Sequence, residues 1–312
     1  MDGYDYNTGK FIDYSEQFDI ATTNNPYDAM AHDFFKVSYW VREKGVPMFY
    51  ISYCYMGRSF WGIDCLKSET FSYFWKIFSE NQYVLKLAKK YEIIKGENVV
   101  VSGYPKMDTL ANIKINDKNK KMIIIAPHHT IDNSERAVGG FLQFSDIILQ
   151  LPKKYPNIDF VFRPHPLLFE NLNTKYWGKE KTDKYLSELL SNSNITYSEE
   201  GNYLELFANS NALIHDCSSY TAEYLYTGKP CAFMYRKDLN PNCIWTDFGK
   251  SCIKSHYLIK NNLDLDLFID NVIIKGNDYL KMQRDNFAKE QVMLNYPNST
   301  DYIVNYLTSQ FK

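Results

Sequence analysis

The sequence predicts an α/β protein with two domains, each built on a parallel sheet. Short apolar runs alternate with segments of helical spacing, which is the pattern of strand, helix and strand units. The 312 residues are enough for two domains with a hydrophobic core each. A segment rich in Lys and Asn, residues 114–121, is the predicted linker. We therefore expect a first domain over 1–115, a second over 120–285 and a C-terminal helical region over 286–312.

In the first domain, apolar runs predict strands over residues 18–23, 47–53 and 99–102. A helix is expected to pass through Phe34–Val37 between the first two. Few residues precede the strand at 18–23, so we expect this domain to be truncated relative to a full Rossmann-like domain. The alternation of strands and helices indicates a parallel sheet.

A helical, aromatic stretch is expected from Phe71 to Ile94. Four aromatic residues share the i, i+3, i+4, i+7 spacing of one helix face: Phe71, Phe74, Trp75 and Phe78. Three lysines follow them: Lys86, Lys89 and Lys90. One interpretation is an amphipathic helix that rests on a membrane. The other, which the sequence favours, is a helix that faces the core and has a solvated lysine end.

In the second domain, buried strands are expected over residues 122–125, 158–162, 212–214 and 231–235. A helix over 220–226 precedes the last of them. Ser218 or Ser219 stands at its N-cap position, and Gly228 ends it. The backbone N–H groups and the dipole of such a helix start favour an anion, so this turn is a candidate phosphate site. An ordinary capped helix fits the same residues.

The composition restricts the partners and the compartment. Acidic and basic residues nearly balance, 37 against 35, which excludes a broad positive field for nucleic acid or an anionic membrane. The chain starts without a signal peptide and has no run of about 20 apolar residues. Six cysteines show no metal-ligand spacing and are expected to be free thiols. We expect a cytoplasmic protein, or one at the inner face of a bacterial cell membrane.

Four short motifs each follow an apolar run, where loops at strand ends are expected. The first contains Gly103, Pro105 and Asp108, and the second contains His128 and His129. The third is Arg163-Pro164-His165-Pro166, and the fourth is His215-Asp216-Cys217-Ser218-Ser219. In this order they resemble the motifs of the CDP-glycerol glycerophosphotransferase family, whose enzymes build teichoic acid and related capsule backbones. The resemblance covers about residues 99–235.

The resemblance implies a GT-B-like fold, in which two Rossmann-like domains enclose a cleft and the C-terminal helix crosses back to the first domain. It implies a nucleotide-activated donor, bound mainly by the second domain. By resemblance, Arg163 and His165 stabilise the donor diphosphate, and Ser218 and Ser219 bind it. Asp216 and Glu223 would hold the loop or the ribose hydroxyls. Gly103, Pro105 and Asp108 are expected on the donor side, near the cleft.

Several residues depart from the family motifs. Lys106 replaces an Arg, His128-His129 replaces Thr-Trp, His215 replaces Thr and Cys217 replaces Tyr. In the family, the catalytic base is expected to be a His followed by Gly in the first domain. The corresponding loop here, residues 53–57, holds no His, and His32 lies on a predicted helix. His128 or His129 is therefore the candidate for proton transfer.

Two adjacent histidines also suggest metal ligands. No third ligand follows at a fitting spacing, so no metal is expected at His128 and His129. The Asp264-Leu265-Asp266 segment is expected at the start of a surface helix and not at a metal.

The resemblance implies transfer of glycerol phosphate, or a related polyol phosphate, from a CDP-alcohol to a hydroxyl group. The acceptor would be lipid-linked or a polysaccharide of the cell envelope, and peripheral membrane association is part of this hypothesis. No cofactor is expected, because the CDP-alcohol is a substrate. Two alternatives stay open: a GT-B glycosyltransferase that uses a UDP- or CMP-sugar, and a relative that binds the donor without turnover.

Overall fold

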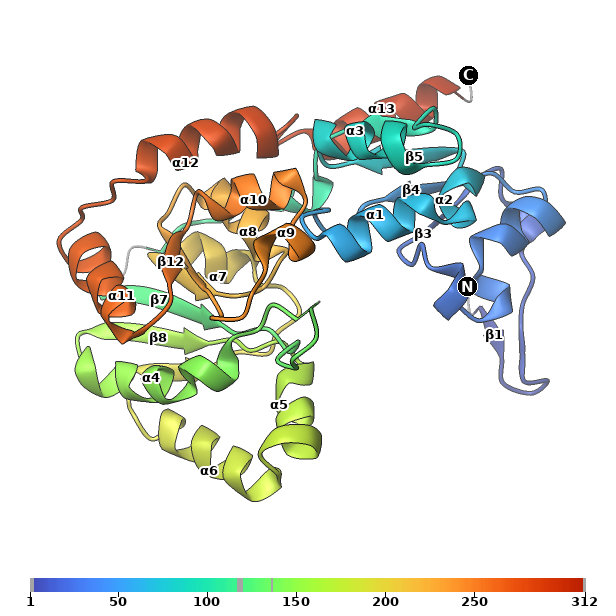
Figure 1. Cartoon of the computed structure of the whole chain (residues 1–312). Coiled ribbons are helices and arrows are strands. Elements are labelled where there is room, and N and C mark those ends of the chain that lie inside the picture. The colour runs from blue at the N-terminus through green and yellow to red at the C-terminus, as the bar shows by residue number, and fades with distance from the viewer. Residues whose placement is uncertain (1–2, 117–119, 136, 311–312) are drawn as a thin grey trace.

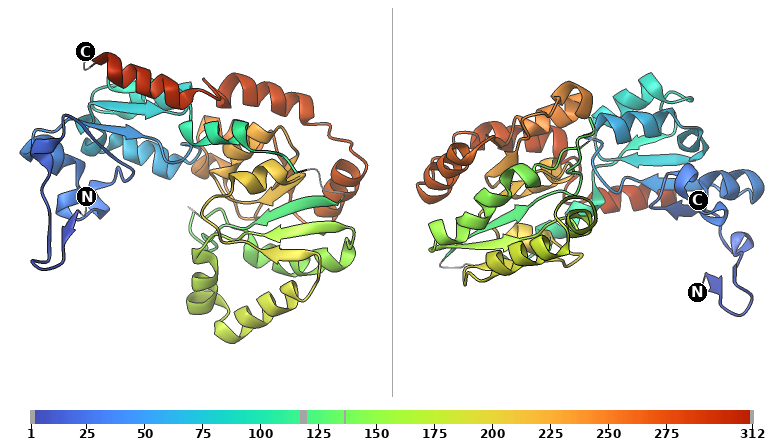
Figure 2. Two further views of the ribbon diagram at one scale, coloured as in Figure 1. Left: turned by 180° about the vertical axis from the view of Figure 1, so that it is seen from behind. Right: turned by 60° about the horizontal axis from the view of Figure 1, so that its bottom comes forward.

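The computed structural model describes residues 3–116, 120–135 and 137–310, which form two lobes (Figure 1). The first lobe contains a four-stranded parallel sheet in the order β3-β4-β5-β6. Its strands are β3 (Ala21–Thr23), β4 (Met48–Ile51), β5 (Lys76–Ser79) and β6 (Val99–Val101). A small antiparallel hairpin of β1 (Tyr4–Asp5) and β2 (Lys10–Phe11) projects from this lobe (Figures 1 and 2).

The second lobe contains a six-stranded parallel sheet in the order β12-β11-β10-β7-β8-β9. Its strands are β7 (Lys121–Ala126), β8 (Ile158–Phe162), β9 (Ile195–Tyr197), β10 (Ala212–His215), β11 (Cys231–Met234) and β12 (Tyr257–Ile259). This is the strand order of Rossmann folds, and the order reverses between β7 and β10. The expected class, two Rossmann-like lobes with parallel sheets, is confirmed.

The second sheet is covered on both faces because successive side chains of a strand point to opposite sides. Ile123 and Ile125 of β7 pack with α4 (Phe141–Lys154), α6 (Lys179–Leu190) and α11 (Asn262–Leu267). Ile124 and Ala126 pack on the other face. The helices there are α7 (Leu204–Asn209), α8 (Tyr220–Glu223) and α10 (Asp247–Ile253). Other short helices are α1 (Ser59–Lys67), α2 (Glu69–Tyr73), α3 (Gln82–Tyr91), α5 (Leu167–Asn171) and α9 (Pro241–Ile244).

The helix predicted over Phe71–Ile94 is only partly confirmed. Residues 82–91 form α3 and α2 ends at Tyr73, but strand β5 lies between them and pairs with β4 on one side and β6 on the other. Phe71, Phe74 and Phe78 are 1%, 2% and 0% exposed, so they belong to the core and cannot rest on a membrane. Within the described residues, no helix is long and apolar enough to cross a membrane.

Two smaller predictions are settled by the structure, and a third lies partly outside the described residues. The segment around Phe34–Val37 forms a 3₁₀ turn over Asp33–Phe35 and a separate helical turn over Tyr39–Glu43, not one helix. Part of the predicted linker, residues 117–119, lies outside the described residues. All six cysteines are free thiols, as expected.

The C-terminal segment joins the lobes. Helix α12 (Lys281–Phe287) lies on the second lobe, and α13 (Ser299–Gln310) lies over the first (Figures 1 and 2). The rings of Tyr306 and Phe78 meet at a centroid distance of 5.5 Å. Asp108 accepts hydrogen bonds from the backbone N–H and the hydroxyl of Thr300, both at 2.7 Å, at the start of α13.

Gly103 lies directly beneath this returning segment. Its φ is +84°, and a Cβ atom there would stand 2.0 Å from the carbonyl oxygen of Leu294 and 2.6 Å from Ser299 Oγ. Pro105 opens the 3₁₀ helix over Pro105–Asn112, whose Asp108 binds Thr300. The first motif therefore contacts the C-terminal segment.

We expect Gly103→Ala to lower the free energy of unfolding by more than about 3 kcal/mol, because it combines a left-handed backbone with a clash against a carbonyl group. Gly178→Ala is the matched control, since Gly178 has a similar φ of +77° but open space around it. The Gly178→Ala substitution should lower the free energy of unfolding by only about 1 to 2 kcal/mol. Urea unfolding of both variants measures the difference, and equal losses would contradict the close approach.

Candidate functional site

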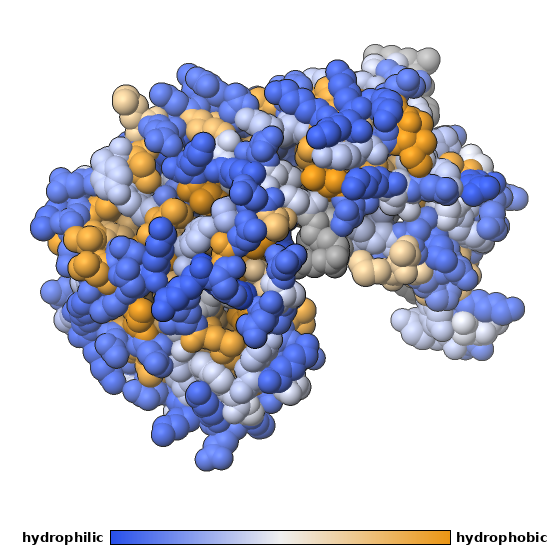
Figure 3. Space-filling view, viewed as in Figure 1, coloured by the Kyte–Doolittle hydropathy of each residue, from blue (hydrophilic) through white to orange (hydrophobic). Residues whose placement is uncertain are grey.

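The carboxyl ends of both parallel sheets open onto one cavity of about 320 Å³. Loops after β3 and β4 supply its first wall, which includes Tyr27, Tyr53 and Met56. Loops after β7, β8 and β10 supply the second wall. Its residues include His128, His129, His165, Ser218 and Ser219. Figure 3 shows the notch between the two lobes. The second wall lies at the reversal of strand order between β7 and β10, where open α/β sheets bind ligands.

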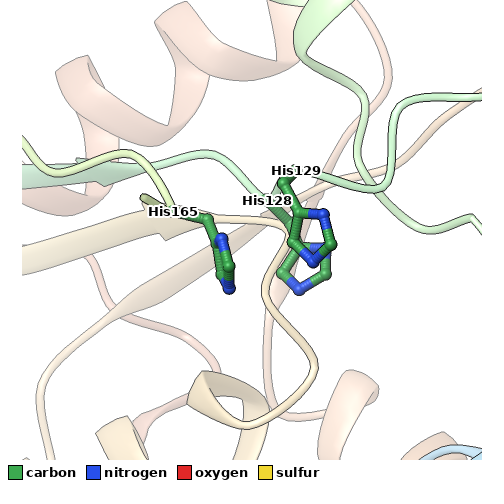
Figure 4. Close-up of side chains that lie close together, drawn as sticks. All are labelled: His128, His129 and His165. Atoms are coloured by element: carbon green, nitrogen blue, oxygen red, sulfur yellow. The ribbon is translucent and has the colours of Figure 1, made fainter. Parts of the chain in front are cut away.

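Three histidines form a compact cluster on the second wall. His128 and His129 follow β7, and His165 comes from the loop after β8 with its ring facing theirs (Figure 4). The ring centroid of His165 is 4.1 Å from that of His129 and 5.1 Å from that of His128. Residues far apart in the sequence are thus brought into one site.

Backbone hydrogen bonds hold the two histidine loops together. The N–H of His165 donates to the carbonyl of Pro127 at 2.9 Å, and the amide of Asn171 donates to the carbonyl of His129 at 3.1 Å. Asp216, which is fully buried, accepts from the N–H groups of His128 and Gly140. Burial raises the pKa of Asp216 to about 7, although these two hydrogen bonds act in the opposite direction. Asp216 therefore positions the His128 loop from behind the cavity.

The hydrogen bonds at the rings define which nitrogen carries the proton. The N–H of Thr130 donates to Nδ1 of His128, and the N–H of Leu167 donates to Nδ1 of His165, both at 3.2 Å. A neutral imidazole whose Nδ1 accepts a hydrogen bond carries its proton on Nε2. The hydroxyl of Thr130 also lies 2.8 Å from Nδ1 of His128 and can donate to it, so the Nε2–H tautomer satisfies both contacts. We therefore assign His128 and His165 as Nε2–H donors. No described residue hydrogen-bonds to the ring of His129, so either of its tautomers is available.

All three imidazoles are held in the neutral form. Burial lowers the pKa of His165 to about 4, and the neighbouring His129 also lowers it. Burial also lowers the pKa of His128 well below its usual value, and the neighbouring His129, His165 and Arg58 add to this. Burial also lowers the pKa of His129, and the neighbouring Arg58 guanidinium lowers it further. Arg58 itself is 8% exposed and lines the cavity.

The cluster is close enough to share a cation, since one ligand atom of each ring lies within 4.8 Å of the others. Two features favour an anion instead. The Nε2 atoms of His128 and His165 carry protons and not lone pairs, and the positive charge of Arg58 lies beside the rings. Within the described part of the chain, no carboxylate lines the cavity. Neutral N–H donors beside a guanidinium, with the hydroxyls of Ser218 and Ser219, suit a phosphate group.

Some of the predicted site residues lie outside the cavity lining. Arg163 donates to Ser198 Oγ at 3.1 Å and to the carbonyl of Glu200, and it lies over the Tyr203 ring. Glu223 is fully buried and binds the hydroxyls of Tyr203 and Tyr104. Gly103, Pro105 and Asp108 hold the C-terminal segment, as described above.

The turn at Ser218 and Ser219 differs in detail from the prediction. Ser219 is the N-cap residue of α8, as expected. Its backbone is helical, and within the described residues its side chain forms no capping hydrogen bond. Gly228 ends the following 3₁₀ turn in the left-handed conformation, as expected.

Several residues of the cavity were not predicted from the sequence, among them Tyr27, Tyr53, Arg58 and Met56. Arg58 follows the loop after β4, and the scarcity of arginines was a signal that could have found it. Met56 also lines the cavity, in the loop at 53–57 where the resemblance led us to expect a His followed by Gly. A thioether cannot accept a proton at neutral pH, so Met56 cannot act as a general base.

The chain resembles known proteins in sequence and in fold. The model of a family described as CDP-Glycerol:Poly(glycerophosphate) glycerophosphotransferase matches residues 66–241. No curated protein matches significantly. The wall teichoic acid polymerase TagF is 14% identical, with a TM-score of 0.61 over 86% of this chain and 69% of that one. The UDP-GlcNAc 2-epimerase from Neisseria meningitidis is 20% identical, with a TM-score of 0.57 over 87% and 72%. At these identities the structures show the GT-B fold alone.

Long-range ¹H–¹⁵N spectra at pH 7 should show the Nε2–H tautomer for His128 and His165. His215 and His256 are internal controls, because their Nδ1–H groups face the carbonyls of Cys217 and Cys252 at 3.1 and 2.9 Å. These two should show the Nδ1–H tautomer. The same tautomer at His165 as at His256 would contradict the assignment of donors.

The buried histidines should make the protein sensitive to acid. Burial lowers the pKa of His165 and His256 to about 4, from 6.5 for an exposed histidine. Between these values the unfolded chain binds more protons than the folded one, so the free energy of unfolding falls as the pH falls from 6.5 to 4. Urea unfolding across this pH range should show that the free energy of unfolding decreases less in His256→Gln than in the wild type. If it depends on pH equally in both proteins, His256 is not held neutral.

Proposed function

The chain belongs to the CDP-glycerol:poly(glycerophosphate) glycerophosphotransferase family, and from this premise we propose that it transfers glycerol phosphate from CDP-glycerol to an acceptor hydroxyl in the cavity between its sheets. The acceptor oxygen forms a bond to the β-phosphorus, and the bond from this phosphorus to the bridging oxygen breaks. CMP leaves with the bridging oxygen, and the acceptor hydroxyl releases a proton. The observation that carries the proposal is the cluster of neutral histidines beside Arg58 at the strand ends.

The donor diphosphate would lie against the second wall. The Nε2–H groups of His128 and His165 would donate to its oxygens, and Arg58 would supply the positive charge. Phosphoryl transfer depends mainly on positioning and on such electrostatic stabilisation. The hydroxyls of Ser218 and Ser219 line the same wall and complete the set of donors. Arg163, which lies outside the cavity, has no part in this arrangement.

His129 is the proposed proton acceptor. It is half-buried on the cavity wall, and its ring is not committed to a hydrogen bond with any described residue. Burial and Arg58 keep its pKa low in the empty cavity. A bound diphosphate would raise that pKa, because negative charge stabilises the imidazolium. The binding of the donor would thus activate the base that the acceptor needs.

We expect His129→Gln to lower kcat for CMP release by about 10²- to 10⁴-fold, the usual loss on removal of a general base, with little change in the KM for CDP-glycerol. Arg58→Gln should raise that KM by at least tenfold, because a charge-assisted contact to the diphosphate is lost. His32→Gln is the control, since His32 is exposed and caps a 3₁₀ turn remote from the cavity.

A coupled assay of CMP release measures these parameters. Introduction of Met56→His into His129→Gln should restore part of the rate, because it returns an imidazole to the opposite wall. Unchanged kcat in His129→Gln would rule out the assigned base. If the wild type binds CDP-glycerol but releases no CMP with any acceptor tried, the chain is a donor-binding relative without turnover.

A further inference from the structure

The first wall of the cavity differs in chemistry from the histidine wall. It consists mainly of aromatic side chains: Tyr27, Tyr50, Tyr53, Tyr55 and Phe71. Arg58 is the one residue with a permanent charge among the described residues that line the cavity. The first wall is therefore an aromatic surface, and Arg58, its one cation among the described residues, can neutralise the charge of one phosphate at most.

The aromatic wall is preorganised. The hydroxyls of Tyr27 and Tyr53 hydrogen-bond at 2.7 Å, and their rings stand nearly perpendicular, at 86°. Tyr53 is 46% exposed, and the hydroxyl of Tyr104 donates to its carbonyl at 2.6 Å, which fixes the loop backbone. Tyr50 and Phe71 are 3% and 1% exposed and pack edge to face behind this pair. A ligand would therefore meet Tyr27 and Tyr53, supported by buried rings.

Such a wall does not suit a polyanion. A poly(glycerol phosphate) chain carries a negative charge on each repeat, and burial of an unpaired charge against tyrosines is strongly unfavourable. Arg58 lies beside the histidines, where the donor diphosphate is proposed to bind. Once it is engaged there, the described lining supplies no cation for a second phosphate. A sugar ring, by contrast, has apolar C–H faces and polar edges, which match an aromatic body with a hydroxyl tip.

We propose that the aromatic wall binds a neutral glycosyl ring, and that the acceptor is the terminal sugar of a glycan and not a poly(glycerol phosphate) end. This inference rests on the proposed function for the reaction, but the sugar site itself can be tested without turnover. The cavity volume of about 320 Å³ is at the lower end for small-molecule sites. It suits one terminal ring beside a diphosphate better than an extended chain.

Saturation-transfer difference NMR tests the site with two sets of probes. One set holds neutral methyl hexopyranosides and methyl N-acetylhexosaminides, and the other holds a glycerol phosphate trimer. We expect saturation of the sugar ring protons by the wild type and at least fivefold less by Tyr53→Ala. Tyr53→Phe should retain most of the signal because it keeps the ring. Tyr6→Ala is the exposed control, since Tyr6 is 86% exposed and lies outside the cavity lining.

Three outcomes would overturn the inference: stronger binding of the glycerol phosphate trimer than of any glycoside, equal glycoside signals in Tyr53→Ala and wild type, or displacement of the glycoside by CMP. The last would assign the aromatic wall to the nucleoside. Circular dichroism shows whether each variant is folded, and CDP-glycerol binding is measured on the same samples. Glycoside binding without CDP-glycerol binding would refute the proposed function and leave the sugar site standing.

Discussion

The whole site depends on the close approach of two backbones at Gly57 and Gly249. A Cβ atom on Gly249 would lie 2.1 Å from the carbonyl oxygen of Gly57, so only glycine fits. Thr246 donates its N–H to Gly57 O at 3.0 Å and its hydroxyl reaches the carbonyls of Met56 and Gly57. The loop after β4 is thus fixed to the start of α10 in the other lobe. Because that loop carries Tyr53 and Arg58, the contact sets the distance between the two walls.

The chemistry of the site follows from this geometry. Parallel strands place their carboxyl ends at one edge, and here two such edges face each other across a small cavity. Desolvation keeps the histidines neutral, while the short turns at Thr130 and Leu167 orient the Nε2–H groups of His128 and His165. An uncharged donor set with one guanidinium can bind a diphosphate and still leave His129 free to accept a proton.

The sequence predicted the four central strands of the second lobe, because buried strands such as Ile158–Phe162 are short apolar runs that end at polar residues. The two edge strands, β9 and β12, were missed. The prediction also failed at β5, where aromatic residues at helical spacing are buried by pairing with β4 and β6. The direction of individual side chains could not be predicted from the sequence either. Arg163 and His165 are neighbours in one motif, yet Arg163 binds Ser198 and only His165 reaches the cavity. His165 was predicted as a site residue, but its closeness to His128 and His129 was not, because folding and not sequence spacing brings the three rings together.

The proposed function requires that CDP-glycerol bind between the two walls through Arg58 and the histidines. The decisive measurement is a calorimetric titration of CDP-glycerol and UDP-N-acetylglucosamine into the wild type, Arg58→Gln and Arg163→Gln. We expect CDP-glycerol to bind in preference to the uridine ligand, Arg58→Gln to lose most of the affinity, and Arg163→Gln to retain it. A preference for the uridine ligand, or affinity lost in Arg163→Gln and kept in Arg58→Gln, would contradict the proposed function.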